Sequence, residues 1–192
     1  MRVVFASRNR HKAEQVALLL PGFELIPLDG VAPDLVLEEP FDTFEENAFA
    51  KARAVVIATG LPAIADDSGI EVDALGGAPG VRSARYAGEA ATDRENNRKL
   101  VDRLEYVSEE NRTARYRCVA VMVTPDGREV SADGSCEGRI VLEPRGTEGF
   151  GYDPHFEPLD DSRTMAEIPL SEKLGFSHRG RAFRGLAHKL GL

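Results

Sequence analysis

Strand-length apolar runs alternate with helical patterns through the first hundred residues of this 192-residue chain. The run at 2–6 predicts a buried strand, and the periodic apolar positions from Ala13 to Leu20 predict a helix that ends at Pro21. A second strand is expected at 23–28. Such alternation is typical of α/β proteins, in which helices cover the faces of a central sheet.

Two capping boxes mark the starts of the next two helices. Thr43 and Glu46 stand three residues apart, as do Thr92 and Glu95, so each threonine can cap a helix end. The first of these helices is expected to continue to about Thr59, because glycine and proline follow it. Both helices extend the alternating pattern.

The later part of the chain carries a hairpin signal. Residues 115–124 alternate between apolar and polar positions, 125–127 form a turn signal, and a strand is expected to return from Arg128. A last helix is predicted from about Ser177. Because a hairpin adds antiparallel pairing, the sequence predicts an α/β protein with a mixed sheet.

Composition narrows the range of partners. The chain carries 24 Lys and Arg against 32 Asp and Glu, a formal charge of -8, which disfavours binding to a nucleic acid polymer. No apolar run approaches the roughly 18 residues of a membrane span, and the first run is too short for a secretory signal. Cys118 and Cys136 form neither a disulfide framework nor a zinc set. We therefore expect a cytoplasmic protein with a small-molecule ligand and no membrane partner.

Two adjacent acids, Asp66 and Asp67, directly follow a short strand predicted at 62–65, and Ser68 comes next. Adjacent carboxylates are costly to hold together without a cation, and the carboxyl end of an α/β strand is where ligands usually bind. Mg²⁺ takes carboxylate oxygens together with phosphate oxygens. The pattern therefore favours a magnesium and phosphate site, with an Asx-type turn and a glycine-rich surface loop as the alternative.

Two polar segments are candidates for binding phosphate. Residues 7–12 lie between the first strand and its helix, where unsatisfied backbone N–H groups attract anions. This segment is not a Walker A loop, because it lacks the glycines and the Gly-Lys-Ser/Thr ending. Asn47 and Lys51 share one helix face. Taken alone, each segment is also explained by an ordinary solvated helix surface.

Two further segments are candidates for binding a flat ring. Phe150 and Tyr152 stand between glycines and suit stacking, while the adjacent Asp153 can read the edge of a base. His178 and Arg179 open the last helix against its dipole, an arrangement that a bound anion or base carbonyl would compensate. The alternatives are a turn with two core aromatics and a capped helix with exposed basic neighbours.

These five segments, in this order, resemble the noncanonical purine nucleoside triphosphate pyrophosphatases, also called XTP/dITP diphosphatases or inosine triphosphate pyrophosphatases. The matching stretches read SRNRHK, ENAFAKA, ADDSGIEVDALGGAPGVRSARYAG, FGYDP and SHRG, and they extend from Ser7 to the last helix. Each motif alone is modest, but the ordered set is highly specific. One departure is that Ser7 and Arg8 replace the family's usual Thr-Gly pair.

The resemblance implies one two-lobed domain over residues 1–192, an α/β fold whose curved mixed β-sheet carries flanking helices around a central cleft. It implies a homodimer, a requirement for Mg²⁺, and the hydrolysis of ITP, dITP and XTP to the nucleoside monophosphate and pyrophosphate. Such an activity cleanses the nucleotide pool.

The resemblance also implies a role for each site residue. Asp67 is the catalytic base and a metal-linked acid, and a second metal acid falls on Glu38 or Glu39, of which Glu38 is favoured. Lys12, Lys51 and Lys173 belong with the phosphates or sugar, and the aromatic and SHRG segments belong with the base. The residues assigned to substrate are Ser7, Arg8, Asn9, Arg10, His11, Lys12, Lys51, Ser68, Phe150, Gly151, Tyr152, Asp153, Lys173, His178 and Arg179.

Two other functions remain open on the sequence alone. The Maf-like pyrophosphatases hydrolyse pyrimidine or modified nucleotides on a similar architecture, but the FGYDP and SHRG segments argue against them. A nucleotide sensor without catalytic activity would keep the pocket and would not need two acids suited to a metal.

Overall fold

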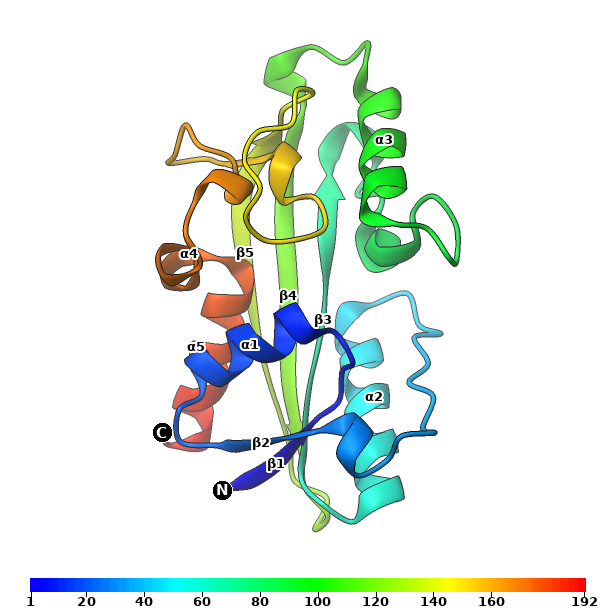
Figure 1. The fold of residues 1–192 in the computed structure, drawn as a ribbon, viewed down its shortest axis with the longest axis vertical. Coiled ribbons are helices and arrows are strands. Elements are labelled where there is room, and N and C mark those ends of the chain that lie inside the picture. The colour runs from blue at the N-terminus through cyan, green and yellow to red at the C-terminus, as the bar shows by residue number, and fades with distance from the viewer. The chain divides into compact units, whose positions relative to one another are not determined.

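The structure is a computed structural model that describes residues 1–192. Its six strands form one sheet in the order β2-β1-β3-β4-β5-β6. The elements in chain order (Figure 1) are β1 Arg2–Phe5, α1 Arg10–Leu19, β2 Glu24–Pro27, α2 Phe44–Thr59, β3 Ala63–Val72, α3 Asp93–Leu104, β4 Thr113–Val123, β5 Glu129–Ile140, β6 Phe156–Pro158, α4 Leu170–Phe176 and α5 His178–Leu190.

The pairing of the strands confirms the mixed sheet. β1 runs parallel to both β2 and β3, whereas β5 and β6 are antiparallel. The predicted hairpin turn is also present, since the Thr124 N–H donates to the Arg128 carbonyl at 3.0 Å and the Gly127 N–H donates to the Thr124 carbonyl at 2.9 Å. The α/β class predicted from the alternation of strands and helices is therefore correct.

The chain divides into two compact units, each built from separate stretches of sequence. The first unit comprises Met1–Asp67, Cys118–Gly134 and Arg179–Leu192. The second unit comprises Ser68–Arg117 and Ser135–His178. One boundary falls within β3, directly after Asp67, so the two candidate acids belong to the first unit.

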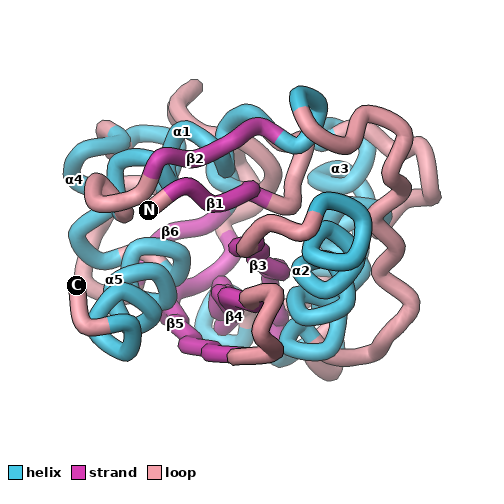
Figure 2. Tube along the Cα trace, turned by 90° about the horizontal axis from the view of Figure 1, so that it is seen from below, coloured by secondary structure: helices cyan, strands magenta, loops and turns pink.

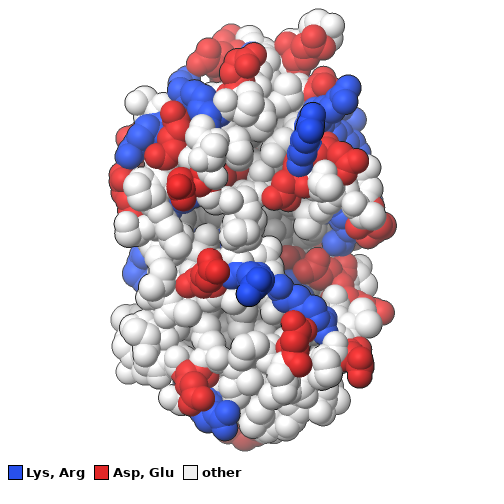
Figure 3. All heavy atoms as spheres, in the orientation of Figure 1, with Lys and Arg blue, Asp and Glu red and all other residues white.

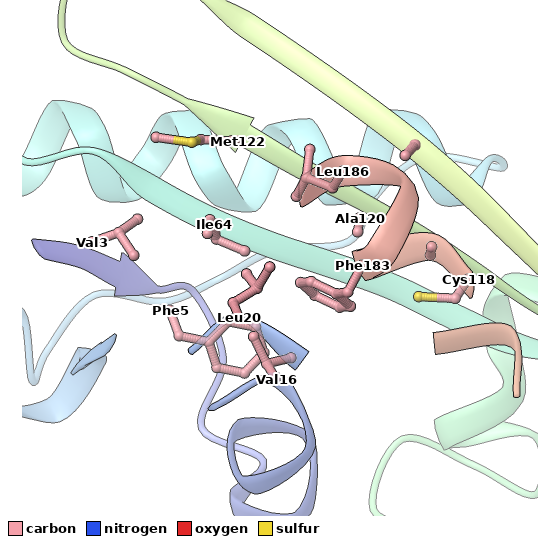
Figure 4. Packing of buried hydrophobic residues seen from close by; sticks show 12 residues of the cluster. Val3, Phe5, Val16, Leu20, Ile64, Cys118, Ala120, Met122, Phe183 and Leu186 are labelled. Atoms are coloured by element: carbon pink, nitrogen blue, oxygen red, sulfur yellow. The ribbon is translucent and has the colours of Figure 1, made fainter. Parts of the chain in front are cut away.

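The core of the first unit lies where α1 and α5 pack on the strands. Figure 4 shows Phe5 from β1, Leu20 after α1 and Phe183 from α5 close together, with Ile64 of β3 alongside. All four side chains are at most 2% exposed. Figure 2 shows α2 on the opposite side of β3 and β4 from α5. The strands of this unit are therefore covered on both faces.

The second unit has its own core around α3 and the strands. Ile70 of β3, Leu100 and Leu104 of α3, Ile140 of β5 and Phe156 of β6 belong to one buried cluster. Each of the five is fully buried. Burial of this extent, at about 25 cal/mol per Å² of apolar surface, holds the unit together without disulfides.

The helices begin where the sequence signals placed them. The Thr43 hydroxyl accepts a hydrogen bond from the Glu46 N–H at 3.2 Å and caps α2. Thr92 and Glu95 form a complete capping box at α3. Both caps satisfy backbone donors that would otherwise lack a partner at a helix start.

One element differs from its prediction in a way that matters for function. The strand expected at 62–65 continues to Val72, so Asp66 and Asp67 lie inside β3 and not after its end. The turn-forming residues Ser68 and Gly69 suggest a loop, but Ile70 and Val72 are fully buried and keep the chain extended. Long-range packing therefore overrides the local turn signal here.

Charged side chains are spread over one face of the molecule (Figure 3). Acidic and basic side chains lie side by side over much of the face shown in Figure 3. None of the helices is both long enough and apolar enough to cross a membrane.

Candidate active site

The two adjacent acids point to opposite faces of β3, because successive side chains alternate along a strand. Asp66 points toward α1 and α5, where its partners Lys12 and Arg179 lie, and Asp67 points toward Lys51 on α2. The two acids are only 1% and 4% exposed. The strand thus gives each buried carboxylate its own cations, which lowers the cost of placing two acids side by side.

Asp66 is the centre of a buried ion-pair network. Its Oδ2 lies 3.1 Å from Lys12 Nζ, and accepts from Arg179 Nε at 3.3 Å and Arg179 Nη2 at 3.2 Å. The Cys118 thiol donates to the same oxygen at 3.8 Å. Burial alone would raise the pKa of Asp66, but Lys12 and Arg179 outweigh it and hold the pKa below its usual range. Asp66 is therefore a permanently charged anchor.

This network changes the expected role of Arg179. The SHRG motif assigned Arg179 to the base, but its side chain is 4% exposed, pairs with Asp66, and donates to Gln15 Oε1 at 3.0 Å. The sequence reveals that a cation opens α5 but does not reveal which strand residue it meets. Arg179 thus joins α5 to β3 and α1 within the first unit.

Asp67 lies beside a lysine and a second acid. Lys51 Nζ is 3.6 Å from Asp67 Oδ1 and 2.6 Å from Glu39 Oε1. Burial raises the pKa of Asp67, the Lys51 cation opposes this, the Glu39 carboxylate adds to it, and the pKa is raised overall. Burial lowers the pKa of Lys51, but Asp67 and Glu39 outweigh it and the net shift is upward. Asp67 is thus suited to accept a proton beside a lysine that keeps its own.

The structure favours Glu39 over Glu38 as the second acid. Glu38 is exposed, whereas Glu39 is half-buried and bonded to Lys51. Asn47 fixes the segment that carries Glu39, because its Oδ1 accepts from the Phe41 N–H at 2.9 Å and its Nδ2 donates to the Phe41 carbonyl at 3.0 Å. We therefore propose Glu39 where the sequence favoured Glu38, since sequence without a helical or strand period cannot tell which of two adjacent acids turns inward.

The donors around Asp67 fit a hard divalent cation. Asp67 and Glu39 set two carboxylates against the single ammonium of Lys51, so a buried acid excess remains. No group of three or more Asp, Glu, His or Cys side chains converges to hold a metal by protein ligands alone. Mg²⁺ commonly binds through one or two carboxylates and completes its shell with waters and substrate phosphates.

The segment at the start of α1 forms a capped helix start. Asn9 caps the helix by accepting from the Lys12 N–H at 3.1 Å, and the Ser7 hydroxyl accepts from the Asn9 N–H at 3.2 Å. Arg10 and His11 are exposed on the first turn of the helix. The segment therefore carries polar and basic groups around a helix start, as predicted.

Arg8 is the exception, because its side chain leaves this segment. Its guanidinium donates to Asp29 Oδ1 at 2.8 Å, to the Leu35 carbonyl at 2.9 Å and to the Pro33 carbonyl at 2.6 Å. Arg8 was assigned to substrate, but it ties down residues 29–35, which lead to Glu39. Arg8, which stands where the family has glycine, therefore binds the loop at residues 29–35, and the sequence could not reveal this contact.

In the second unit, the aromatic segment supplies one half-buried ring and one core ring. Phe150 is half-buried, whereas Tyr152 is 4% exposed and donates its hydroxyl to the Ser83 carbonyl at 2.8 Å. Stacking on both aromatics was expected, and the structure leaves only Phe150 for that role. Tyr152 packs in the core of the unit because its hydroxyl finds a buried partner there.

Asp153 and Lys173 form a buried pair in the same unit. Lys173 Nζ lies 3.2 Å from Asp153 Oδ2, and the Tyr116 hydroxyl donates to Asp153 Oδ1 at 3.1 Å. Burial raises the pKa of Asp153, and Lys173 and Tyr116 only partly offset it. Lys173 was assigned to the phosphates, but its ammonium is engaged with Asp153.

Tyr116 is a site residue that no motif indicated. Its ring stacks on His178 with centroids 4.6 Å apart and an interplanar angle of 13°, while its hydroxyl holds Asp153. His178 is 8% exposed. The alternation of β4 predicted Tyr116 as an ordinary strand residue, and only the tertiary structure shows that it joins two candidate base-binding residues.

Comparisons with known proteins find relatives over nearly the whole chain. The Ham1 family pattern matches residues 3–189. A dITP/XTP pyrophosphatase of Geobacter sulfurreducens is 48% identical over 192 residues, which cover 99% of this chain and 96% of that protein. A second dITP/XTP pyrophosphatase, from Symbiobacterium thermophilum, is 50% identical over 191 residues, covering 98% and 94%. The solved structure of the Staphylococcus aureus Ham1 protein superposes with a TM-score of 0.90 at 38% identity, covering 100% of this chain and 98% of that one.

Proposed function

The chain belongs to the Ham1 family, and on that premise we propose that it hydrolyses ITP, dITP and XTP to the nucleoside monophosphate and pyrophosphate. The observation that carries the proposal is the buried Asp67, whose pKa is raised and which lies beside Lys51, a lysine that also pairs with the second acid Glu39. A binding protein would have no need of a buried base with a raised pKa.

The chemistry starts from the charge of the substrate. A triphosphate carries about four negative charges, so an attacking water must be deprotonated and guided against repulsion. Asp67 accepts the proton from that water, the oxygen bonds to the α-phosphorus, and the bond to the bridging oxygen breaks to release pyrophosphate. Lys51 lies next to Asp67 and supplies positive charge at the reacting phosphate.

Asp67 and Glu39 are the residues that would hold Mg²⁺. A bound Mg²⁺ neutralises phosphate charge and makes the pyrophosphate a better leaving group. Lys12 adds a cation at the start of α1, where its ammonium lies 3.1 Å from Asp66. Backbone N–H groups at a helix start commonly bind anions, so this helix start is suited to a phosphate group.

Base recognition would rest on His178, Asp153 and the half-buried Phe150. Hypoxanthine and xanthine carry a carbonyl at position 6, where adenine carries an amino group. His178 or a backbone N–H can donate to the carbonyl, whereas the amino group of adenine would leave that donor unpaired. An unpaired buried donor costs about 1–3 kcal/mol, enough to separate ITP from ATP. Arg179 is not needed here, because Asp66 holds it.

The purified protein is expected to release pyrophosphate from ITP, dITP and XTP in the presence of Mg²⁺. The value of kcat/KM for ATP should be at least about fivefold lower, in proportion to the cost of one unpaired donor. A screen of all standard and deaminated nucleoside triphosphates, read as pyrophosphate release, measures both. Tight binding of ITP without turnover would instead identify a nucleotide sensor, and equal turnover of ATP would contradict the proposed base recognition.

The position of the broken bond provides a second arm of the same test. In ¹⁸O-labelled water the label should enter the nucleoside monophosphate and not the pyrophosphate, because water attacks the α-phosphorus. Label in inorganic phosphate with a nucleoside diphosphate as co-product would mean attack at the γ-phosphorus. That result would reverse the proposed orientation of the triphosphate.

Glu39→Gln is expected to weaken the response to Mg²⁺ by about 10–100-fold, because it removes one of two carboxylates suited to the ion. The matched variant Glu38→Gln removes a neighbouring carboxylate that is exposed, and it should leave the response unchanged. Titrations of activity with Mg²⁺, and of the free protein with Mn²⁺ followed by paramagnetic resonance, measure the effect. A larger loss in Glu38→Gln than in Glu39→Gln would restore the assignment made from sequence.

We also retain a cytoplasmic location and a homodimer as proposals. The motif resemblance supports both, and the composition supports the first.

A further inference from the structure

The backbone N–H and carbonyl of Gly151 are both held by side chains of one helix. Gly151 donates its N–H to Asp93 Oδ2 at 2.7 Å, and its carbonyl accepts from Asn97 Nδ2 at 2.8 Å. Asp93 and Asn97 stand four residues apart on α3, so their side chains share one face of the helix. All three residues belong to the second unit.

The loop that contains Gly151 has little intrinsic preference for its observed shape. Gly149 and Gly151 adopt φ values of +87° and +64°, which glycine reaches freely but does not favour over other conformations. A side chain at Gly149 would collide with the Asp153 carboxylate and the Lys173 ammonium. The close approach of Asp153 and Lys173 therefore requires glycine at position 149. Because glycine has many accessible conformations, contacts from outside the loop must select the observed one.

On its α3 side the loop borders a cavity of about 490 Å³, lined by Asn97 and Val101 of α3 and by Leu142, Gly149 and Phe150. The two hydrogen bonds from α3 to Gly151 are contacts from outside the loop on this side.

The chemistry of Asn97 is also directional. The Gly151 carbonyl can only accept, so Asn97 must present its amide nitrogen, and its Oδ1 has no hydrogen-bond partner. A carboxylate of the same shape at position 97 could not make this bond. Asp93 differs, because an amide of the same shape at position 93 still offers an oxygen to the Gly151 N–H.

We propose that Asp93 and Asn97 are positioning residues that set base selectivity by fixing the backbone at Gly151. This inference rests on the proposed function, because it assigns the selectivity to the loop that carries Phe150 and Asp153. The two bonds hold the peptide planes on either side of the Gly151 Cα, so they fix its φ and ψ and thereby the direction of the chain between Phe150 and Asp153. Neither positioning residue is required to touch the nucleotide.

The test compares isosteric and truncating variants at the two positions. Asp93→Ala and Asn97→Asp each remove one bond to Gly151, and each should raise KM for ITP and lower the preference for ITP over ATP by about 2–10-fold. The value of kcat should change less than about twofold, because Asp67 and its surroundings are untouched. Asp93→Asn keeps an acceptor and should restore values close to those of the unchanged protein.

Glu105→Ala is the matched control, because it removes an exposed carboxylate at the C-terminal end of the same helix, away from the cavity. It should change neither selectivity nor KM. Hydrogen exchange at the Gly151 amide gives a readout without activity, and exchange should accelerate in Asp93→Ala but not in Glu105→Ala.

Two outcomes would overturn the inference. One is unchanged selectivity in Asp93→Ala and Asn97→Asp although the Gly151 amide exchanges faster, and the other is an Asp93→Asn variant as impaired as Asp93→Ala. If the unchanged protein binds ITP but does not hydrolyse it, the proposed function fails. The inference is then judged by ITP and ATP affinities from calorimetry on the same variants, where a loss of preference would support it and unchanged affinities would overturn it.

Discussion

Asp67→Asn is expected to lower kcat for ITP by at least about a hundredfold, because the amide keeps the shape of the side chain but cannot take a proton from water. Burial raises the pKa of Asp67, which makes the carboxylate a stronger base than an exposed aspartate. The amide would also weaken any bound Mg²⁺. Both effects act on the chemical step, so the loss should appear in kcat.

Steady-state kinetics and calorimetric binding of ITP measure this effect. Asp133→Asn is the matched control, since Asp133 is an exposed aspartate on β5 in the first unit and should not affect turnover. A variant at Asp67 with near-normal kcat would remove the base from the mechanism. Loss of ITP binding together with loss of fold would instead mean that the carboxylate is structural.

Asp66→Asn is expected to lower the free energy of unfolding by about 3–5 kcal/mol, the usual cost of breaking a buried ion pair from one side. The substitution leaves Arg179, which is 3% exposed, and Lys12 without their shared carboxylate. Their charges would remain buried and only partly compensated by Gln15. The effect should therefore be one of stability before it is one of catalysis.

Urea unfolding followed by circular dichroism, without added metal, measures that loss. Asp67→Asn is the internal comparison, because Lys51 keeps its 2.6 Å bond to Glu39 when Asp67 is neutral. Its loss of stability should be clearly smaller than that of Asp66→Asn. A larger loss of stability in Asp67→Asn than in Asp66→Asn would show that the ion pairs of Asp66 with Lys12 and Arg179 do not stabilise the first unit.

These two variants separate functions that the sequence presents as one motif. In the sequence, Asp66 and Asp67 are adjacent acids that suggest a shared cation. In the folded strand they point to opposite faces, Asp66 into an ion-pair network and Asp67 toward Lys51 and Glu39. Had the chain turned after Asp66, as the local signals suggest, the two carboxylates would not be separated in this way.

Sequence alone determined the class of fold, the starts of α2 and α3, and the family. Capping boxes at Thr43 and Thr92 and the turn at 125–127 are local features, set by residues within a few positions of each other, so they can be predicted without knowing the fold. The ordered motifs identified the family because they preserve chemistry at fixed spacings. Asp67 and Lys51 were predicted from those motifs, and the structure brings them together.

Only the tertiary structure decided what the long side chains do. Arg8 bonds to Asp29 and to the loop that follows it. Arg179 pairs with Asp66, 113 positions away in the sequence. The Tyr116 hydroxyl, on β4, donates to Asp153 in the segment before β6. Glu39 was separated from Glu38 in the same way, by its contact with Lys51 twelve positions away. A motif specifies which charged group is present, but it does not specify the group's partner. A buried charge must be paired because removing it from water costs free energy. That cost depends on every element that surrounds the charge in the folded protein.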